Sequence, residues 1–348
     1  MKRTVLTILS VLPLGGTQAH HSFFGRFDTS TTMELEGLVT NVIWRNPHAH
    51  FTLEVETDGE VVEWDLESGS PTLMRRAGVP PNAVQVGQRI RVAANPPVTD
   101  KKEAFATNVL LPDGEELVLQ TGATPKFADQ VTGDFSYRFR TEGDRGAPEL
   151  GLFRIWTFSG AAGPTAFLFP ESIDRSYDLN NYPLTAAART AIAAFDPATD
   201  NPTNDCTPKG MPLIMEQPLP LQIADRGDEI ALIIEEYDLT RTVHMGQIDA
   251  PAGTPRSPLG YSVGFWDGDT LVVRTTHLNW PNFDQAGIPQ SELSVLTERF
   301  TAVEEGSELE YEVIVDDPVN FTEPVKLTKT LLYVPDVEMI PFECIVSE

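Results

Sequence analysis

The sequence predicts a mainly β protein, in which a small OB-like barrel on the N-terminal side is followed by an antiparallel barrel of the lipocalin or calycin type. Polar and apolar residues alternate over short runs in residues 32–119 and again in residues 219–348, as strands with one buried face require. Turn signals such as Asp58-Gly59 and Asp267-Gly268 separate these runs, which favours antiparallel hairpins. No Gly-rich phosphate loop, heptad or internal repeat is visible.

The first barrel is expected from strand runs at residues 33–44, 50–55, 61–66, 89–94 and 106–111, with a last hairpin leading to 116–119. A short helical stretch from Ser70 to Ala77 has a proline in its first turn and ends before Gly78. Five or six short strands with one helix between the third and the fourth is the OB-like arrangement.

The stretch from residue 121 to residue 215 is less regular and rich in Gly, Pro and Asp. It contains one convincing helix, from Thr185 to Phe195, with Thr185 as the N-cap. The runs 152–158 and 165–169 are expected to add strands to the second barrel. We therefore expect residues 121–215 to be an irregular connector with one helix, in which residues 200–215 are ordered because Cys206 anchors them.

The second barrel is expected from residue 216 to the end of the chain. Its predicted strands are 219–224, 229–237, 239–245, 260–266, 270–276, 293–302, 308–316, 325–333 and 341–346. Hairpin-linked strands of this number predict an up-and-down barrel, which usually encloses a ligand cavity.

Residues 1–19 read as a cleavable export signal. Lys2 and Arg3 precede an apolar run from Val5 to Leu14, and Thr17-Gln18-Ala19 approximates a signal-peptidase site. The alternative is an uncleaved membrane anchor, but the apolar run is shorter than the roughly 20 residues needed to cross a bilayer. We expect a periplasmic or secreted protein whose mature form begins at or next to His20 and that has no membrane segment, with an OB-like domain at residues 20–120.

The net charge of the chain argues against certain classes of binding partner. It has 51 acidic and 25 basic residues, a net charge of -26, which argues against nucleic acid and anionic membranes as partners. The two cysteines, Cys206 and Cys344, are expected to form a disulfide because exported proteins meet an oxidising compartment. The alternative is a pair of free thiols or a thiolate metal site.

The histidines are concentrated near the start of the chain, where His20, His21, His48 and His50 stand within the first fifty residues. A histidine at the mature N-terminus offers its amine and its imidazole to one cation, and a further imidazole completes a nitrogen site that suits copper. His48 and His50 are two residues apart, so they share one face of a strand. Copper is the first metal expected here and zinc the second. The competing interpretation is that both imidazoles form structural hydrogen bonds in a tight turn that enters a strand.

The second barrel has its own acid-base candidates, His244, Glu235 and Arg241, which could act in a dry cavity as proton donors and acceptors. Strand alternation would place Glu235 and Tyr237 on one face, and Arg241 and His244 on opposite faces. The competing interpretation is that Glu236 and Asp238 are solvated and that Arg241 forms a salt bridge at the barrel end. Phe265 and Trp266 are expected to plug the barrel.

The N-terminal region resembles a family of bacterial exported proteins of unknown function. The resemblance covers about residues 19–119 and depends on three motifs: His20-His21-Ser22-Phe23, Asn46-Pro47-His48-Ala49 and Leu66-Glu67-Ser68-Gly69-Ser70-Pro71.

The second half is similar to another uncharacterised group of exported bacterial proteins. Its marks are Pro183-Leu184-Thr185, Asp196-Pro197, Cys206 with Pro208 and Gly210, residues 241–245, residues 264–273 and Thr297-Glu298-Arg299-Phe300. Both resemblances imply export, and neither implies an activity.

The leading hypothesis is an exported two-domain protein that binds a metal ion, copper first, at its N-terminal histidines and a small apolar or amphipathic ligand in the second barrel. One alternative is a cofactor-independent lyase, isomerase or hydratase acting in that barrel, and another is a copper-dependent redox enzyme. No Gly-x-Ser-x-Gly, His-Glu-x-x-His or acidic calcium loop is present, which argues against serine hydrolases, zinc peptidases and EF-hand proteins.

Overall fold

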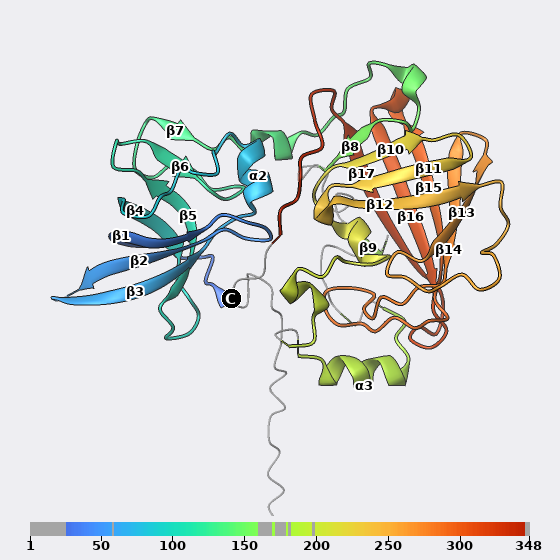
Figure 1. The fold of residues 1–348 in the computed structure, drawn as a ribbon, viewed down its shortest axis with the longest axis horizontal. Helices are drawn as coiled ribbons and strands as arrows, with labels where there is room; N and C mark the ends of the chain where they lie inside the picture. The colour runs from blue at the N-terminus through green and yellow to red at the C-terminus, as the bar shows by residue number, and fades with distance from the viewer. Residues whose placement is uncertain are drawn as a thin grey trace, which may run out of the picture.

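The computed structural model describes residues 26–57, 59–158, 169–170, 179, 182–196 and 199–344. The predicted signal segment, with His20 and His21, lies outside these residues. The described chain forms two β-barrels (Figure 1), so the mainly β fold class is confirmed. Of the helices in the described ranges, none is both long and apolar enough to cross a membrane.

The first barrel has the predicted OB-like arrangement. Its sheet runs in the order β3-β2-β1-β4-β5, and a parallel pairing of β3 with β5 closes it. The strands are β1 (Met33–Ile43), β2 (His50–Thr57), β3 (Glu60–Glu67), β4 (Arg89–Asn95) and β5 (Glu103–Leu110), extended by β6 (Glu116–Val118) and β7 (Val131–Thr132).

Helix α2 (Pro71–Arg76) lies between β3 and β4, as expected. Its Met74 is fully buried in the first core together with Phe51 and Leu66. The hydroxyl of Ser70, the N-cap residue, makes no capping bond and instead donates to the side-chain oxygen of Asn46 at 2.8 Å. The helix start is thereby linked to the turn that carries His48.

In the described part of the chain, nine strands close the second barrel in the order β16-β15-β14-β13-β12-β11-β10-β8-β17, with β17 paired to β16. They are β8 (Ile155–Thr157), β10 (Leu221–Asp225), β11 (Glu229–Ile234), β12 (Leu239–Met245), β13 (Tyr261–Asp267), β14 (Thr270–Thr276), β15 (Val295–Val303), β16 (Glu308–Asp316) and β17 (Val325–Tyr333). The predicted barrel is thus confirmed, with one feature that was not predicted: β12 and β13 are parallel. A closed ring with an odd number of strands cannot alternate direction throughout, so at least one parallel pair is required.

Two predicted strands differ from the structure. The run 229–237 ends at Ile234, and a 3-10 turn over Glu236–Asp238 follows, with Tyr237 at φ 62°. The expected alternation of Glu235 and Tyr237 therefore does not apply. The run 341–346 is not a barrel strand over its described residues, and β8 from the connector pairs with β10 and β17 instead.

The remaining elements are short. Helix α3 (Ala186–Ala194) is confirmed, and its cap Thr185 accepts a hydrogen bond from the backbone nitrogen of Ala188 at 3.2 Å. The others are β9 (Phe169–Pro170), which pairs with β17, and the 3-10 turns Ser136–Phe139, Pro148–Leu150, Pro202–Asp205, Leu213–Glu216 and Glu304–Gly306.

Residues 334–344, which we name the C-terminal strap, follow β17 and run between the two barrels beside α2 (Figure 1). The strap contacts the second barrel through the backbone nitrogen of Phe342, which donates to the Asp238 carboxylate at 3.1 Å. It contacts the first barrel through the Glu343 carbonyl, which accepts from the Asn46 nitrogen at 2.9 Å. The predicted disulfide joins Cys206 to Cys344 across 138 residues.

Candidate functional site

Two histidines and two carboxylates share the outer face of the β2–β3 hairpin. His50 is paired in register with Glu67, and directly paired residues place their side chains on the same face. His48 and Asp65 lie two residues from these partners and so face the same way. Ala49 and Leu66 alternate with them and are fully buried in the barrel core.

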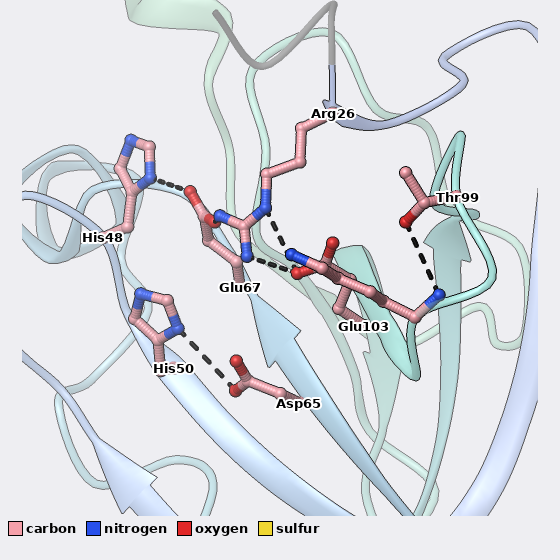
Figure 2. A network of polar contacts seen from close by, with 8 residues as sticks. Arg26, His48, His50, Asp65, Glu67, Thr99 and Glu103 are labelled. Atoms are coloured by element: carbon pink, nitrogen blue, oxygen red, sulfur yellow. Dashed lines mark hydrogen bonds and ion pairs between the residues drawn. The ribbon is translucent and has the colours of Figure 1, made fainter. Parts of the chain in front are cut away.

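The Nδ1 atom of each imidazole faces a carboxylate (Figure 2). His48 Nδ1 contacts Glu67 at short hydrogen-bond range, and His50 Nδ1 lies 3.8 Å from Asp65. The edge of the Phe105 ring packs against His48, with the ring centroids 6.4 Å apart.

Arg26 joins this cluster to the beginning of the described chain. Its Nη1 atom donates to Glu67 at 2.6 Å, and its Nη2 atom donates to Glu103 on β5 at 2.6 Å (Figure 2). Burial would raise the pKa of Glu67, but the hydrogen bond and charge of His48 and the charge of Arg26 outweigh it, so this pKa is lowered. The contact with His50 lowers the pKa of Asp65. Both carboxyl groups are therefore anionic at neutral pH, as partners of imidazole N–H groups should be.

The Nε2 atoms of His48 and His50 have no hydrogen-bond partner among the described residues. A carboxylate on one ring nitrogen, with the other nitrogen free, is the arrangement that orients metal-binding histidines. Within the described residues no group of three or more His, Cys, Asp and Glu side chains is arranged to hold a metal ion. The described residues thus bring together two imidazoles but no complete metal site, and His20 and His21 lie outside them.

The catalytic candidates of the second barrel have separate environments. Arg241 is buried in the barrel, where it donates to both carboxylate oxygens of Glu298 and to the hydroxyl of Ser262. Glu235 lies at the junction of the barrels and pairs with Arg76 of α2. Burial raises the pKa of Glu235, although the charge of Arg76 opposes this.

His244 has a third set of contacts. It stacks on Tyr261 at a centroid distance of 4.5 Å and lies 3.0 Å from Glu229. The structure therefore does not bring His244, Glu235 and Arg241 into one acid-base site. Arg241 and His244 differ in burial as strand alternation predicts, since Arg241 is buried and His244 is half-buried.

The interior of the second barrel is filled by side chains such as Leu232, Phe300 and Val313, all fully buried. A pocket of about 590 Å³ lies at one mouth of the barrel. Its lining residues include Phe153, Met245, Gly264, Phe265 and Trp266. Phe265 is 58% exposed and Trp266 is 44% exposed. The prediction that these two residues plug the barrel is therefore wrong. They lie exposed at its mouth instead.

Sequence reasoning missed several buried charges in the second barrel. Burial raises the pKa of Glu216 to about 8 and that of Asp284 to about 7. Burial lowers the pKa of Lys329 to about 7, and its Nζ atom donates to the carbonyl of Gln217 at 2.7 Å. A signal was available, since Lys329 and Glu298 occupy positions in alternating runs that predict inward-facing apolar residues.

Comparison with solved structures adds nothing about binding. Two crystal forms of a mitochondrial single-stranded DNA-binding protein from S. cerevisiae match 24% of this chain and 93% and 92% of their own, at 10% identity and TM-scores of 0.19 and 0.20. Similarity this low carries no argument about what the chain binds.

Comparison with known sequences is informative only for the first barrel. No curated protein matches the chain. Residues 11–105 match the model of a family of unknown function, DUF6152, so that the histidine and carboxylate cluster on β2 and β3 falls within the matched region.

Proposed function

We propose that this chain is an exported metal-binding protein, in which the first barrel holds copper through His48, His50 and the histidines at the mature N-terminus. The observation that carries the proposal is the pair of imidazoles whose Nδ1 atoms face Glu67 and Asp65 and whose Nε2 atoms are free. Nitrogen ligands of this kind suit copper first and zinc second.

The position of Arg26 supports the participation of His20 and His21. Its guanidinium is paired with Glu67, the carboxylate that contacts His48. His20 precedes Arg26 by six residues, and a chain of this length reaches at most about 20 Å. If cleavage follows Ala19, as we propose, the new terminal amine and the His20 imidazole are within reach of His48 and His50.

Export is part of the same proposal. The signal-like residues 1–19 support a periplasmic or secreted location, and the resemblance of both halves to exported bacterial groups agrees with it. Intact-mass analysis of the protein recovered from its own export pathway tests this directly. If the measured mass shows that the mature chain does not begin at His20, the His20 amine is not available to the proposed site.

The metal test measures copper bound per chain in the mature protein by calorimetry and metal analysis. The wild type should bind one Cu²⁺, and His48→Ala and His50→Ala should each weaken binding at least about tenfold because each removes a nitrogen ligand. His244→Ala is the matched control, since His244 is also a carboxylate-paired histidine but lies in the other barrel. Absence of binding at micromolar copper, or equal losses in all three variants, would refute the site.

A second candidate function is the capture of a small apolar ligand at the mouth of the second barrel. The observation that favours it is the exposed pair Phe265 and Trp266 beside a pocket of about 590 Å³. Barrel mouths are common ligand sites. At Gly264, which lines the pocket, a Cβ atom would lie 2.6 Å from Val243 Cγ1 and 2.8 Å from Met245 Sδ, so a larger residue would displace these side chains.

The neutral fluorescent probe N-phenyl-1-naphthylamine tests this candidate. It should bind with a stoichiometry of one, and Trp266→Ala should weaken binding about tenfold through loss of its ring contact. Leu293→Ala is the control because Leu293 is 62% exposed and does not line the pocket. Binding that is unchanged in Trp266→Ala would rule this pocket out.

A further inference from the structure

A groove of about 400 Å³ lies between the two barrels, where α2 and the 3-10 turn at residues 136–139 face the C-terminal strap. The first barrel and the segment that follows it contribute Arg75, Arg76 and Arg140. The strap contributes Asp336, Glu338 and apolar side chains such as Ile340. Junctions between domains are frequent ligand sites because both walls can supply polar groups.

The arginine side of the groove is unusual for this chain. Three basic residues line one small groove in a sequence with 25 basic and 51 acidic residues. Arg76 is already engaged, since it pairs with Glu235 and donates to the Glu338 carbonyl at 2.7 Å. Arg75 is exposed and has no ion pair among the described residues. Its guanidinium is therefore available to a carboxylate, which it can hold with two parallel hydrogen bonds.

The strap side carries the opposite charge. Asp336 and Glu338 are exposed, and their carboxylates have no salt-bridge partner among the described residues. Both carboxylates would repel a simple anion, and the arginines would repel a simple cation. A molecule with a carboxylate at one end and an ammonium group at the other satisfies both walls at once. The Ile340 side chain adds an apolar surface to the groove.

We propose that this groove binds a small zwitterion with an apolar body, such as an amino acid or short peptide, with its carboxylate on Arg75 and its ammonium group toward Asp336. The groove shares no lining residue with the pocket at the barrel mouth, and neither His48 nor His50 lines it. It exists only when the strap is in place, because the strap forms one of its walls.

The test is calorimetric titration of the full chain, with its disulfide intact and in metal-free buffer, because free amino acids chelate copper. The probes are L-leucine, 4-methylpentanoate, which lacks the amine, and 3-methylbutylamine, which lacks the carboxylate. L-leucine should bind at least about tenfold more tightly than either single-charge probe, since each of them loses one charge-assisted contact.

Two variants and one control locate the binding. Arg75→Gln and Asp336→Asn should each weaken L-leucine binding about tenfold, and both positions are exposed, so folding is retained. Arg89→Gln is the control, because Arg89 is 61% exposed on β4 and does not line the groove. If 4-methylpentanoate binds as tightly as L-leucine, the ammonium group contributes nothing and the groove binds simple anions. That result would overturn the proposal. No binding of L-leucine up to about 10 mM, or equal effects in all three variants, would also overturn it.

Discussion

Replacing Arg241 with methionine should destabilise the second barrel by about 3–5 kcal/mol. The Arg241 side chain is 2% exposed and that of its partner Glu298 is 0% exposed. The guanidinium donates to both oxygens of Glu298, to Ser262 at 3.0 Å and to Thr275. Methionine keeps most of the volume and removes all of these bonds and the positive charge.

The magnitude follows from what remains. Glu298 would keep the hydroxyl donors of Tyr311, at 2.9 Å, and Thr275, at 3.2 Å, but would lose its only cationic partner among the residues described. A buried carboxylate without a counter-charge either stays ionised at high cost or takes up a proton. Removing one partner of a buried ion pair costs about 3–5 kcal/mol, because the other charge is left buried without a partner. For scale, about 1.4 kcal/mol corresponds to a tenfold change in the unfolding equilibrium.

Urea denaturation with the disulfide intact measures the effect, with Arg91→Met as the control. Arg91 pairs with Glu34 on the surface, where the two side chains are 48% and 49% exposed, so this change should cost at most about 1 kcal/mol. Adding Glu298→Met to Arg241→Met should recover part of the loss, since no unpaired charge is then left. A loss below about 1 kcal/mol in Arg241→Met would refute the reasoning that this ion pair is important for stability.

Four further predictions follow from contacts described above. Glu216 has a folded-state pKa raised by burial to about 8, so the folded barrel binds its proton more tightly than the unfolded chain does. The stability this group contributes is fully present below its unfolded pKa of about 4 and is lost as pH rises toward 8; Glu216→Gln should flatten that decline in urea titrations between about pH 5 and 8, and an unchanged slope would contradict the raised pKa. Glu67→Gln should weaken copper binding by about 10–100-fold while leaving the copper stoichiometry at one, because it removes the carboxylate that orients His48; calorimetry that finds wild-type affinity would assign Glu67 a purely structural role. Thr185→Ala should lower the free energy of unfolding by about 1 kcal/mol through loss of the α3 cap, and no change in the denaturation midpoint would show that the cap bond contributes nothing. Cys206→Ser with Cys344→Ser should lower stability by about 3–5 kcal/mol in the chain-entropy model, a loss that thermal denaturation would detect and that an unaltered Tm would exclude.

Much of the fold was predictable because strand alternation records which side chains are buried. The OB-like order of strands, α2 between β3 and β4 and the cap of α3 follow from local patterns, and the disulfide was predicted from the expectation of export. The 3-10 turn after Ile234 was missed because Glu235 and Glu236 continue an apparent strand pattern, while both carboxylates are in fact engaged with basic residues, Arg76 and Lys209. Local periodicity does not record such tertiary pairings.

The candidate site was only half predictable. The spacing of His48 and His50 indicated a shared face, and the structure places them there. Asp65 and Glu67 were missed, although their spacing on the next strand carries the same signal, because the register between the two strands is needed to bring them together. Arg26 and Glu103 come from distant parts of the chain, and no local pattern indicates their meeting.

The contact between Asn46 and Glu343 also bears on how the protein is made. The first barrel comes early in the sequence, yet the Asn46 nitrogen beside its His48 turn bonds to Glu343 of the strap. Until Glu343 has been synthesised, the surface of the first barrel beside this turn lacks that contact. The strap can settle only after nearly 300 further residues have followed, and the bond between Cys206 and Cys344 then prevents its release. Removing the strap would therefore uncover the surface beside the His48 turn of the first barrel.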